Sequence, residues 1–239
     1  MRMIFIRHGD PDYEKDSLTE KGWREAGLLA GRVARWDVKE FYCSPLGRAQ
    51  ATASLTLEKM HRQAITYDWL KEFRYPVTDP STQRHGVPWD FMPAHWTADP
   101  LFYDRHHWHE AEVFAANEEL KPAYDHVCQE LDKLLAEQGY LRTGNYYRNT
   151  RGKDQEETLV FFCHLGITGV MMSHLLGIAP PLLWQNFFLA PTSVTVLSTE
   201  EREGDTAYFR VQVAGDTTHL HDGGEPISEA GYFAKPFQL

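Results

Sequence analysis

The stretch from Met3 to Gly9 reads MIFIRHG. Its four apolar residues predict a short buried strand, and the arginine, histidine and glycine that follow predict a loop at the carboxyl end of that strand. Open α/β sheets bind their ligands at this end. A histidine at a strand end is also found as a hydrogen-bonded structural residue, so Arg7 and His8 indicate a functional site only if other chemical groups join them.

A second strand with a similar ending lies late in the chain. Thr158–Cys163, with the sequence TLVFFC, is the most apolar strand candidate, and it leads directly into His164. Gly166 then begins a predicted helix that runs to Leu176. Parallel strands end at the same edge of a sheet, so His8 and His164 are expected to lie close together. The alternative for His164 is a buried histidine that only satisfies its own hydrogen bonds.

An arginine is expected at the same edge. A short strand at 41–43 is followed by Ser44, the predicted N-cap of a helix, and by Pro45, its predicted first residue. This places Arg48 in the first turn, where a guanidinium and backbone N–H groups can bind an anion together. Arg7 and Arg48 would then form a two-arginine phosphate clamp. The alternative is that Arg48 lies on the helix surface without a ligand.

The rest of the chain alternates between helical and strand patterns. The predicted elements are a helix that starts at Ser17 or Thr19 and ends near Arg35, a helix at 120–134, an exposed loop at 140–157 and a hairpin formed by 193–197 and 208–213. This alternation predicts an α/β fold. We expect one domain over residues 1–239, with an insertion at about 76–138.

The insertion shows neither helical nor strand periodicity between Pro76 and Trp108. We interpret it as a loop-rich lid that covers the pocket and selects the leaving group. Its histidines also raise the hypothesis of a metal site: His85, His95, His106, His107 and His109. The last three cannot face one point on regular structure, so no metal is predicted. The aromatic residues of the insertion could alternatively form an interface, which leaves a homodimer open.

Composition limits the partners. The chain has 239 residues and a net charge of -10, which argues against nucleic acid and anionic membranes as general partners. Cys43, Cys128 and Cys163 lie outside CxxC pairs, in apolar or helical stretches, and predict reduced thiols in a cytoplasmic protein. No secretion signal, membrane anchor or membrane span is expected from the sequence.

Four motifs together resemble the histidine phosphatase superfamily, which includes the cofactor-dependent phosphoglycerate mutases. They are Arg7-His8-Gly9, LTEKG at 18–22, SPLGRAQAT at 44–52, and His164 at the end of the late strand. The resemblance covers about residues 1–75 and 156–222. It implies a three-layer α/β/α sandwich with a mostly parallel central sheet and a pocket at the carboxyl ends of the strands.

The resemblance also implies roles for four residues. His8 is the expected nucleophile, and Arg7, Arg48 and His164 are expected to bind the phosphoryl oxygens. A neutral imidazole can attack phosphorus if a backbone carbonyl holds its other ring N–H, while the arginines and a protonated His164 neutralise the oxygens. This charge balance requires neither a metal nor another cofactor. A departure is Leu165, at a position where many relatives have glycine.

The proton donor and the pocket's outer residues are less closely matched to the family. The family places a carboxylic acid after the second helix, where the chain has Glu72, so Glu72 is the expected acid. The glycine-containing segment that usually follows is replaced by Arg74-Tyr75-Pro76-Val77, which leaves Asp90 and Glu110 as substitutes. Glu72 could otherwise be a solvated carboxylate. His219, in the segment GDTTHL, either lines the pocket or has a structural role.

These residues support three functions. The first is a phosphatase that hydrolyses a small phosphate monoester through a covalent phosphohistidine. The second is a phosphoglycerate-type mutase, for which the insertion supplies few of the lysines that a bisphosphate would need. The third is a non-catalytic protein that binds a phosphorylated ligand, and this would be favoured if His8 or Arg48 were replaced.

Overall fold

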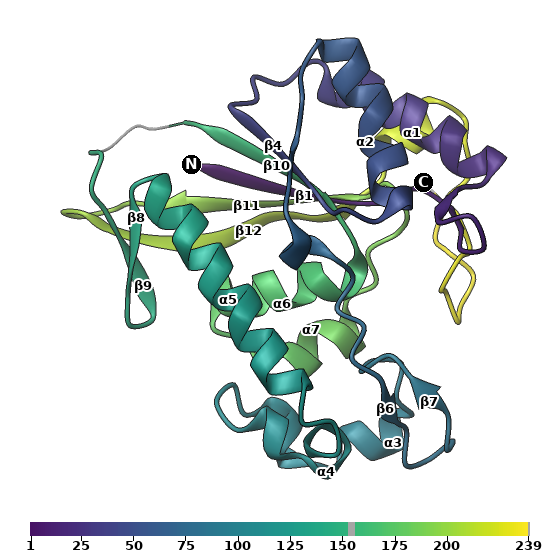
Figure 1. The fold of residues 1–239 in the computed structure, drawn as a ribbon, viewed down its shortest axis with the longest axis vertical. Helices are drawn as coiled ribbons and strands as arrows, with labels where there is room; N and C mark the ends of the chain where they lie inside the picture. Colours follow the sequence, from purple (N-terminus) through teal and green to yellow (C-terminus); the bar gives the residue numbers. More distant parts are fainter. Residues whose placement is uncertain (153–155, 239) are drawn as a thin grey trace.

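The computed structural model describes residues 1–152 and 156–238. The strands of its central sheet are β1 (Arg2–Arg7), β4 (Glu40–Cys43), β5 (Ile65–Thr66), β8 (Tyr140–Thr143), β9 (Tyr146–Asn149), β10 (Thr158–Cys163), β11 (Val194–Glu200) and β12 (Thr206–Asp216). They lie in the order β5-β4-β10-β1-β11-β12-β9-β8 (Figure 1). The four strands from β5 to β1 are parallel, and the strands beyond β1 extend the sheet by antiparallel pairs.

Helices cover both faces of the sheet. The two flanking layers consist of α1 (Glu20–Val33) and α2 (Gly47–Met60) on one face, and of α5 (Leu120–Glu137), α6 (Leu165–Leu176) and α7 (Pro180–Asn186) on the other (Figure 1). Side chains along β1 alternate between the layers, because Ile4 and Ile6 pack with α1 and α2 whereas Met3 and Phe5 pack with α5 and α6. The predicted three-layer sandwich is confirmed.

The register of β1 and β10 sets the position of the two histidines. Arg7 is paired with Cys163, so His8 and His164 follow at the same level of the sheet. The backbone N–H of His8 also donates to the carbonyl of Cys163 at 3.0 Å. Both residues therefore leave the sheet at its carboxyl edge, as the two strand endings predicted.

Of the two residues predicted to cap the first helix, Thr19 is confirmed and Ser17 is not. The Thr19 side chain accepts a hydrogen bond from the N–H of Gly22 and caps α1, whereas Ser17 lies in the short strand β3 (Ser17–Leu18), which pairs with β2 (Pro11–Asp12). The late hairpin and the helix at 120–134 are also confirmed, by β11 with β12 and by α5. Pro122 lies in the first turn of α5. Backbone N–H groups in the first turn have no acceptor within the helix, so proline breaks no helical hydrogen bond there.

The prediction that Ser44 caps the second helix is wrong. α2 begins at Gly47, and Leu46 occupies the N-cap position. The backbone N–H of Ser44 still donates to Phe162, one strand over, so Ser44 belongs to the strand end. Its hydroxyl lies 2.8 Å from Nε2 of His164 and is therefore part of the histidine site rather than a cap.

The prediction of a loop at 140–157 is also wrong for residues 140–149, whereas the described residues 150–152 and 156–157 lie outside helices and strands. β8 and β9 form a hairpin, and β9 pairs with β12, which adds two strands to the sheet. Tyr140 and Tyr147 are buried, while most of the remaining side chains are polar and exposed, which concealed the strand pattern. Gly144 takes a positive φ of 59° at the turn. Residues 153–155 of the predicted loop lie outside the described residues.

The insertion is a set of short elements before α5: β6 (Val77–Thr78), β7 (His85–Gly86), α3 (Pro93–Trp96), η2 (Pro100–Tyr103), η3 (Trp108–Glu110) and α4 (Glu112–Ala115). Buried aromatic rings hold them together, and the ring of Trp108 lies 5.6 Å from that of Trp184 in α7. The aromatic residues of the insertion thus pack into the same hydrophobic core as the sheet and the helices α5, α6 and α7. Within 1–152 and 156–238, no three His, Cys, Asp or Glu side chains form a group that could hold a metal ion.

Two further observations concern the chain as a whole. Cys43, Cys128 and Cys163 are all buried free thiols. In the described ranges, no helix combines the length and the apolar character needed to cross a membrane.

Helix α1 packs directly on the loop that follows His8, which gives a matched test of the fold. A Cβ on Gly22 would lie 2.3 Å from the carbonyl oxygen of Asp10, whereas a Cβ on Gly27 of the same helix would meet nothing within 4 Å. We expect Gly22→Ala to lower the free energy of unfolding by about 1–3 kcal/mol.

Gly27→Ala is the control, and it should raise the free energy of unfolding by about 0.5–1 kcal/mol because glycine weakens a helix interior. Urea unfolding of both variants measures the difference. Equal effects would contradict the backbone contact between α1 and the loop.

Candidate active site

His8 is held in one tautomer at the end of β1. It is 2% exposed, and its Nδ1 lies 2.8 Å from the carbonyl oxygen of Gly9. Because a carbonyl only accepts hydrogen bonds, Nδ1 carries the proton, and Nε2 keeps its lone pair. Burial and, to a lesser extent, the neighbouring Arg7 lower the pKa of His8 to about 3. The imidazole is therefore neutral at physiological pH.

His164 lies beside His8 and is fully buried. The two ring centroids are 5.1 Å apart, and Nε2 of His164 is 2.8 Å from the Ser44 hydroxyl. Burial, followed by the proximity of His8 and Arg48, lowers the pKa of His164 well below its usual value. In the protein by itself, burial and then the neighbouring positive charges favour a neutral His164, in contrast to the expectation of a protonated one.

Arg7 and Arg48 lie at the same place, as the clamp hypothesis predicted. One terminal nitrogen of Arg7 donates to the carbonyl of Leu189 at 2.6 Å, and the guanidinium lies 5.2 Å from the ring centre of Phe188. Arg48 donates to Asp16 at 2.7 Å. The Nε of each arginine is buried and has no hydrogen-bond partner among the described residues. Both guanidinium groups can therefore offer further donors to an anion.

Asp16 is a site residue that the sequence analysis missed. One of its carboxylate oxygens binds Arg48, and the other accepts the N–H of Gly47 at 2.7 Å, the first residue of α2. Burial opposes ionisation, but these donors together lower the pKa of Asp16. Asp16 takes a positive φ of 46° in the loop before α1, which no residue pattern in the sequence indicates.

Glu72 lies between the sheet edge and the first turn of α6. Its Oε1 accepts from the N–H of Phe73 at 2.9 Å and from the N–H of Ile167 at 3.1 Å. Burial raises the pKa of Glu72, although these two donors and Arg7 act in the opposite direction. A Cβ at Gly166 would lie 2.8 Å from this oxygen, so only glycine fits at that position.

The two substitutes for Glu72 are placed differently. Asp90 lines the same cavity, takes a positive φ of 67° and has a pKa that burial raises. Glu110 lies in η3, is exposed and is not among the residues that line the cavity. Asp90 is therefore the better placed alternative to Glu72.

The cavity at this edge has a volume of about 600 Å³. Arg7, Arg48 and Glu72 line it, and the insertion supplies Val87, Trp89 and Asp90. His8 and His164 are buried beside these residues and are not themselves lining residues. The other lining residues are Tyr13, Asp16, Arg74, Leu165, Phe188 and Gly231. The lining thus combines two arginines with aromatic and apolar side chains, and Phe188 and Tyr13 lie next to Arg7 and Arg48.

His219 is linked to Arg7 and His8 through Thr192. It lies in α8 (Thr218–Asp222), and its Nε2 is 3.1 Å from the hydroxyl of Thr192. The backbone N–H of Thr192 in turn donates to the carbonyls of Arg7 and His8. Burial and the neighbouring Arg32 lower the pKa of His219 to about 4. His219 is not a lining residue of the cavity, and its contacts are those of a structural residue.

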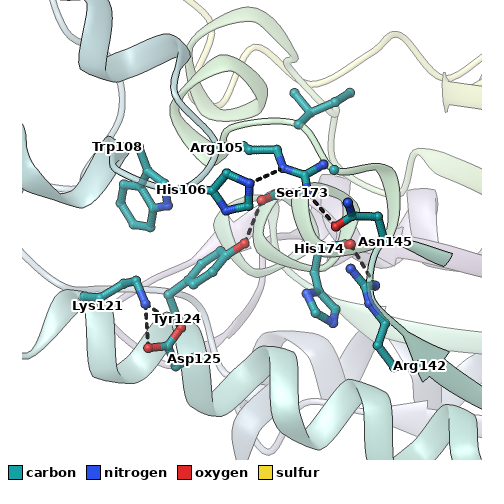
Figure 2. A pocket seen from close by; sticks show the side chains of 12 residues that line it. Arg105, His106, Trp108, Lys121, Tyr124, Asp125, Arg142, Asn145, Ser173 and His174 are labelled. Carbon is teal, nitrogen blue, oxygen red and sulfur yellow. Dashed lines mark hydrogen bonds and ion pairs between the residues drawn. The ribbon is translucent and has the colours of Figure 1, made fainter.

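A second cavity of about 240 Å³ lies at the opposite end of α6 (Figure 2). The hydroxyls of Tyr124 and Ser173 are 3.0 Å apart in it, and Arg142 donates to the carbonyl of His174 in the last turn of α6. Cations stabilise the carboxyl end of a helix, which gives Arg142 a structural role. Arg7, Arg48 and Glu72, which lie next to the two histidines, line the first cavity, which is therefore the candidate active site.

The family follows from this geometry and from comparison with known proteins. A model of the histidine phosphatase superfamily, branch 1, matches residues 3–211. The chain belongs to this superfamily. The resemblance based on four motifs is confirmed, and the match also includes the insertion, which the motifs did not cover.

Individual relatives are more distant. A 2,3-bisphosphoglycerate-dependent phosphoglycerate mutase from Thermoplasma acidophilum is 34% identical over 73 residues, which are 26% of this chain and 36% of that protein. The match therefore spans little more than a third of the mutase.

Solved structures share the fold over most of the chain. A phosphoserine phosphatase from Entamoeba histolytica, solved with phosphoserine, has 18% identity and a TM-score of 0.60, and the match covers 92% of this chain and 98% of that one. The α-ribazole phosphatase from Shigella flexneri has 18% identity and a TM-score of 0.58, with coverage of 91% and 97%. A mycobacterial glucosyl-3-phosphoglycerate phosphatase has 17% identity and a TM-score of 0.58, with coverage of 89% and 97%.

The buried neutral histidines predict a loss of stability in acid. His8, His164 and His219 all have lowered pKa values in the folded state, so below about pH 6.5 the unfolded chain binds protons that the folded chain does not. Each such histidine should contribute a fall of about 1.4 kcal/mol per pH unit in the free energy of unfolding as the pH drops from 6.5 to 5, and the raised pKa of Glu25 contributes with the opposite sign.

The variant His8→Asn should remove one histidine's share of this slope, and His221→Asn, at an exposed position, is the control for the loss of an imidazole. Urea unfolding at pH 7.5, 6 and 5 measures it. A slope that is the same in His8→Asn and in the parent protein would contradict a neutral His8.

Proposed function

We propose that the protein is a phosphatase that hydrolyses a small phosphate monoester through a covalent phosphohistidine on Nε2 of His8. The observation that carries this proposal is the 2.8 Å contact between Nδ1 of His8 and the carbonyl of Gly9, which leaves the lone pair on Nε2. The neighbouring Arg7 and Arg48 supply the donors that neutralise phosphoryl oxygens.

The first half of the proposed reaction forms the phosphoenzyme. Nε2 of His8 attacks phosphorus in line, and the bond from phosphorus to the leaving oxygen breaks. Glu72, whose raised pKa favours its protonated form, gives its proton to the departing alkoxide. A phosphate dianion next to His164 raises the pKa of that histidine, so His164 can take up a proton with the substrate and become a further cationic donor.

The second half releases phosphate. The carboxylate of Glu72 now accepts a proton from water, and the water oxygen attacks the phosphohistidine. The bond between Nε2 and phosphorus breaks, the nitrogen recovers its lone pair, and Glu72 is protonated again. No other reactant is needed for this cycle.

Hydrolysis is favoured over a mutase reaction by the charges of the cavity. Beyond Arg7 and Arg48, Arg74 is the one further lysine or arginine among the lining residues given above, whereas a bisphosphate needs a second cationic group of several residues. The related solved structures named above are phosphatases, and the curated mutase matches over part of its length. Conversion of 3-phosphoglycerate in the presence of 2,3-bisphosphoglycerate would support the mutase alternative.

The leaving group is expected to contact the insertion. Val87 and Trp89 of the insertion add apolar lining to the cavity together with Tyr13 and Phe188, and Arg74 and Asp90 add one charge of each sign. We infer that the lid selects the alcohol part of the substrate, while the inner cluster binds the phosphate. Hydrolysis rates over a panel of phosphorylated metabolites would identify the substrate.

The nucleophile can be tested directly. We expect His8→Ala to lower the hydrolysis of 4-nitrophenyl phosphate at least about 1,000-fold and to abolish an acid-labile phosphoenzyme on rapid quench. His221→Ala is the control for loss of an exposed imidazole. A phosphoenzyme that persists in His8→Ala would show that the nucleophile is another residue, and its absence from the parent protein would favour a non-catalytic binding protein.

The proton donor can be tested by changing the leaving group. Glu72→Gln should slow hydrolysis of an alkyl phosphate roughly 100- to 10,000-fold, because a poor leaving group needs protonation. The same variant should affect 4-nitrophenyl phosphate much less, since a phenolate departs without a proton. Glu110→Gln is the control at an exposed acid, and a leaving-group effect in Asp90→Asn instead of Glu72→Gln would make Asp90 the acid.

A further inference from the structure

Glu25 is a fully buried carboxylate for which the proposed reaction has no direct use. It lies in α1, is 0% exposed, and its Oε2 accepts the backbone N–H of Asp10 at 2.8 Å. The other carboxylate oxygen lies 3.5 Å from Nζ of Lys21. A buried carboxylate is costly, so its partners indicate what it does.

The peptide bond between Gly9 and Asp10 links Glu25 to His8. The carbonyl of this peptide accepts the Nδ1–H of His8 at 2.8 Å, and its N–H donates to Glu25 at 2.8 Å. Hydrogen bonds at the two ends of one amide polarise each other, and an ionised acceptor strengthens both. A negative charge on Glu25 therefore increases the electron density on the Gly9 oxygen, which pulls more strongly on the Nδ1–H of the imidazole.

We propose that Glu25 is a positioning residue that fixes the tautomer of His8 and makes its Nε2 more nucleophilic by acting through the Gly9–Asp10 peptide. The proposal rests on the role given to His8 above. Glu25 does not touch the substrate in this scheme, and its effect depends on its charge as well as on its hydrogen bond.

The residues around this peptide are also held in place, as such a relay requires. The Thr19 hydroxyl donates to the side chain of Asp10 at 2.6 Å, and the Thr19 N–H donates to its carbonyl at 3.0 Å. The hydroxyl of Ser228 donates to the second carboxylate oxygen of Asp10. A Cβ on Gly9 would lie 2.9 Å from the carbonyl oxygen of Gly22, so the loop packs closely against the helix at this point.

The charge of Glu25 changes within the physiological range. Burial raises the pKa of Glu25 to about 7. The charged groups around it are Lys21 on the same helix, Asp10 in the loop after β1, and Glu225 near the end of the chain, which binds Lys21 at 2.8 Å. Glu25 is neutral below pH 7 and ionised above it, so the attack by His8 should become faster as the pH rises through this value.

The test compares Glu25→Gln with Glu20→Gln. Glutamine keeps an acceptor for the Asp10 N–H but never carries a charge, and Glu20 is an exposed residue of the same helix. In single-turnover rapid quench with 4-nitrophenyl phosphate, we expect Glu25→Gln to form phosphoenzyme roughly threefold to tenfold more slowly above pH 7.5. Its rate should also lack the rise near pH 7 that the parent protein and Glu20→Gln show.

A second measurement does not depend on turnover. The ¹⁵N chemical shifts of the His8 ring should show a protonated Nδ1 and should move between pH 6 and 8 in the parent protein and in Glu20→Gln. They should not move in Glu25→Gln. If Glu25→Gln folds poorly, the titration of the parent protein still tests the relay.

Three outcomes are distinguishable. An unchanged pH profile in Glu25→Gln, or ring shifts of His8 that are constant from pH 6 to 8 in the parent protein, would overturn the relay. A phosphoenzyme that survives in His8→Ala would overturn the proposed function, even if the ring shifts respond to Glu25 as expected. Loss of both the rate rise and the shift change in Glu25→Gln supports the relay.

Discussion

The parallel pairing of β1 with β10 is the constraint on which the site depends. Because Arg7 is opposite Cys163, the next residue of each strand is a histidine at the same height. Neighbouring strands lie about 4.8 Å apart, which agrees with the ring separation of 5.1 Å. A shift of either strand by one residue would turn one imidazole to the other face of the sheet. The apolar residues that fix this register therefore also fix the geometry of the proposed chemistry.

The electrostatics of the cluster follow from burial. Burial, with a smaller effect of the two neighbouring arginines, holds the two imidazoles neutral, and Asp16 partly offsets the positive charge of the arginines. A phosphate dianion completes this balance. The cluster is thus arranged for an anion, on a protein whose overall net charge is -10.

The parts of the fold that sequence predicted well are those with local signals. The strands before His8 and His164 are continuous apolar runs, and Thr19 precedes a clear helical stripe. The hairpin of β8 and β9 was missed because its residues are mostly polar, and Ser44 was misread because its hydroxyl binds a histidine 120 residues away. Asp16 and Glu25 carry no local signal at all, since their importance lies in contacts that only the folded chain makes.

The aromatic core of the insertion holds one part of the insertion against α6 and leaves another part, the segment 78–87, outside this packing. Trp184 donates its ring N–H to the carbonyl of Gly166 at 3.0 Å and packs against Trp108, so the anchor of the lid and the first turn of α6 share one side chain. The segment 78–87 is mostly exposed and lies outside this anchor. In the function proposed above, exchange of that segment would change which alcohol is accepted and leave the proposed phosphate-binding residues unchanged. The same scaffold could in this way serve a series of enzymes with different substrates.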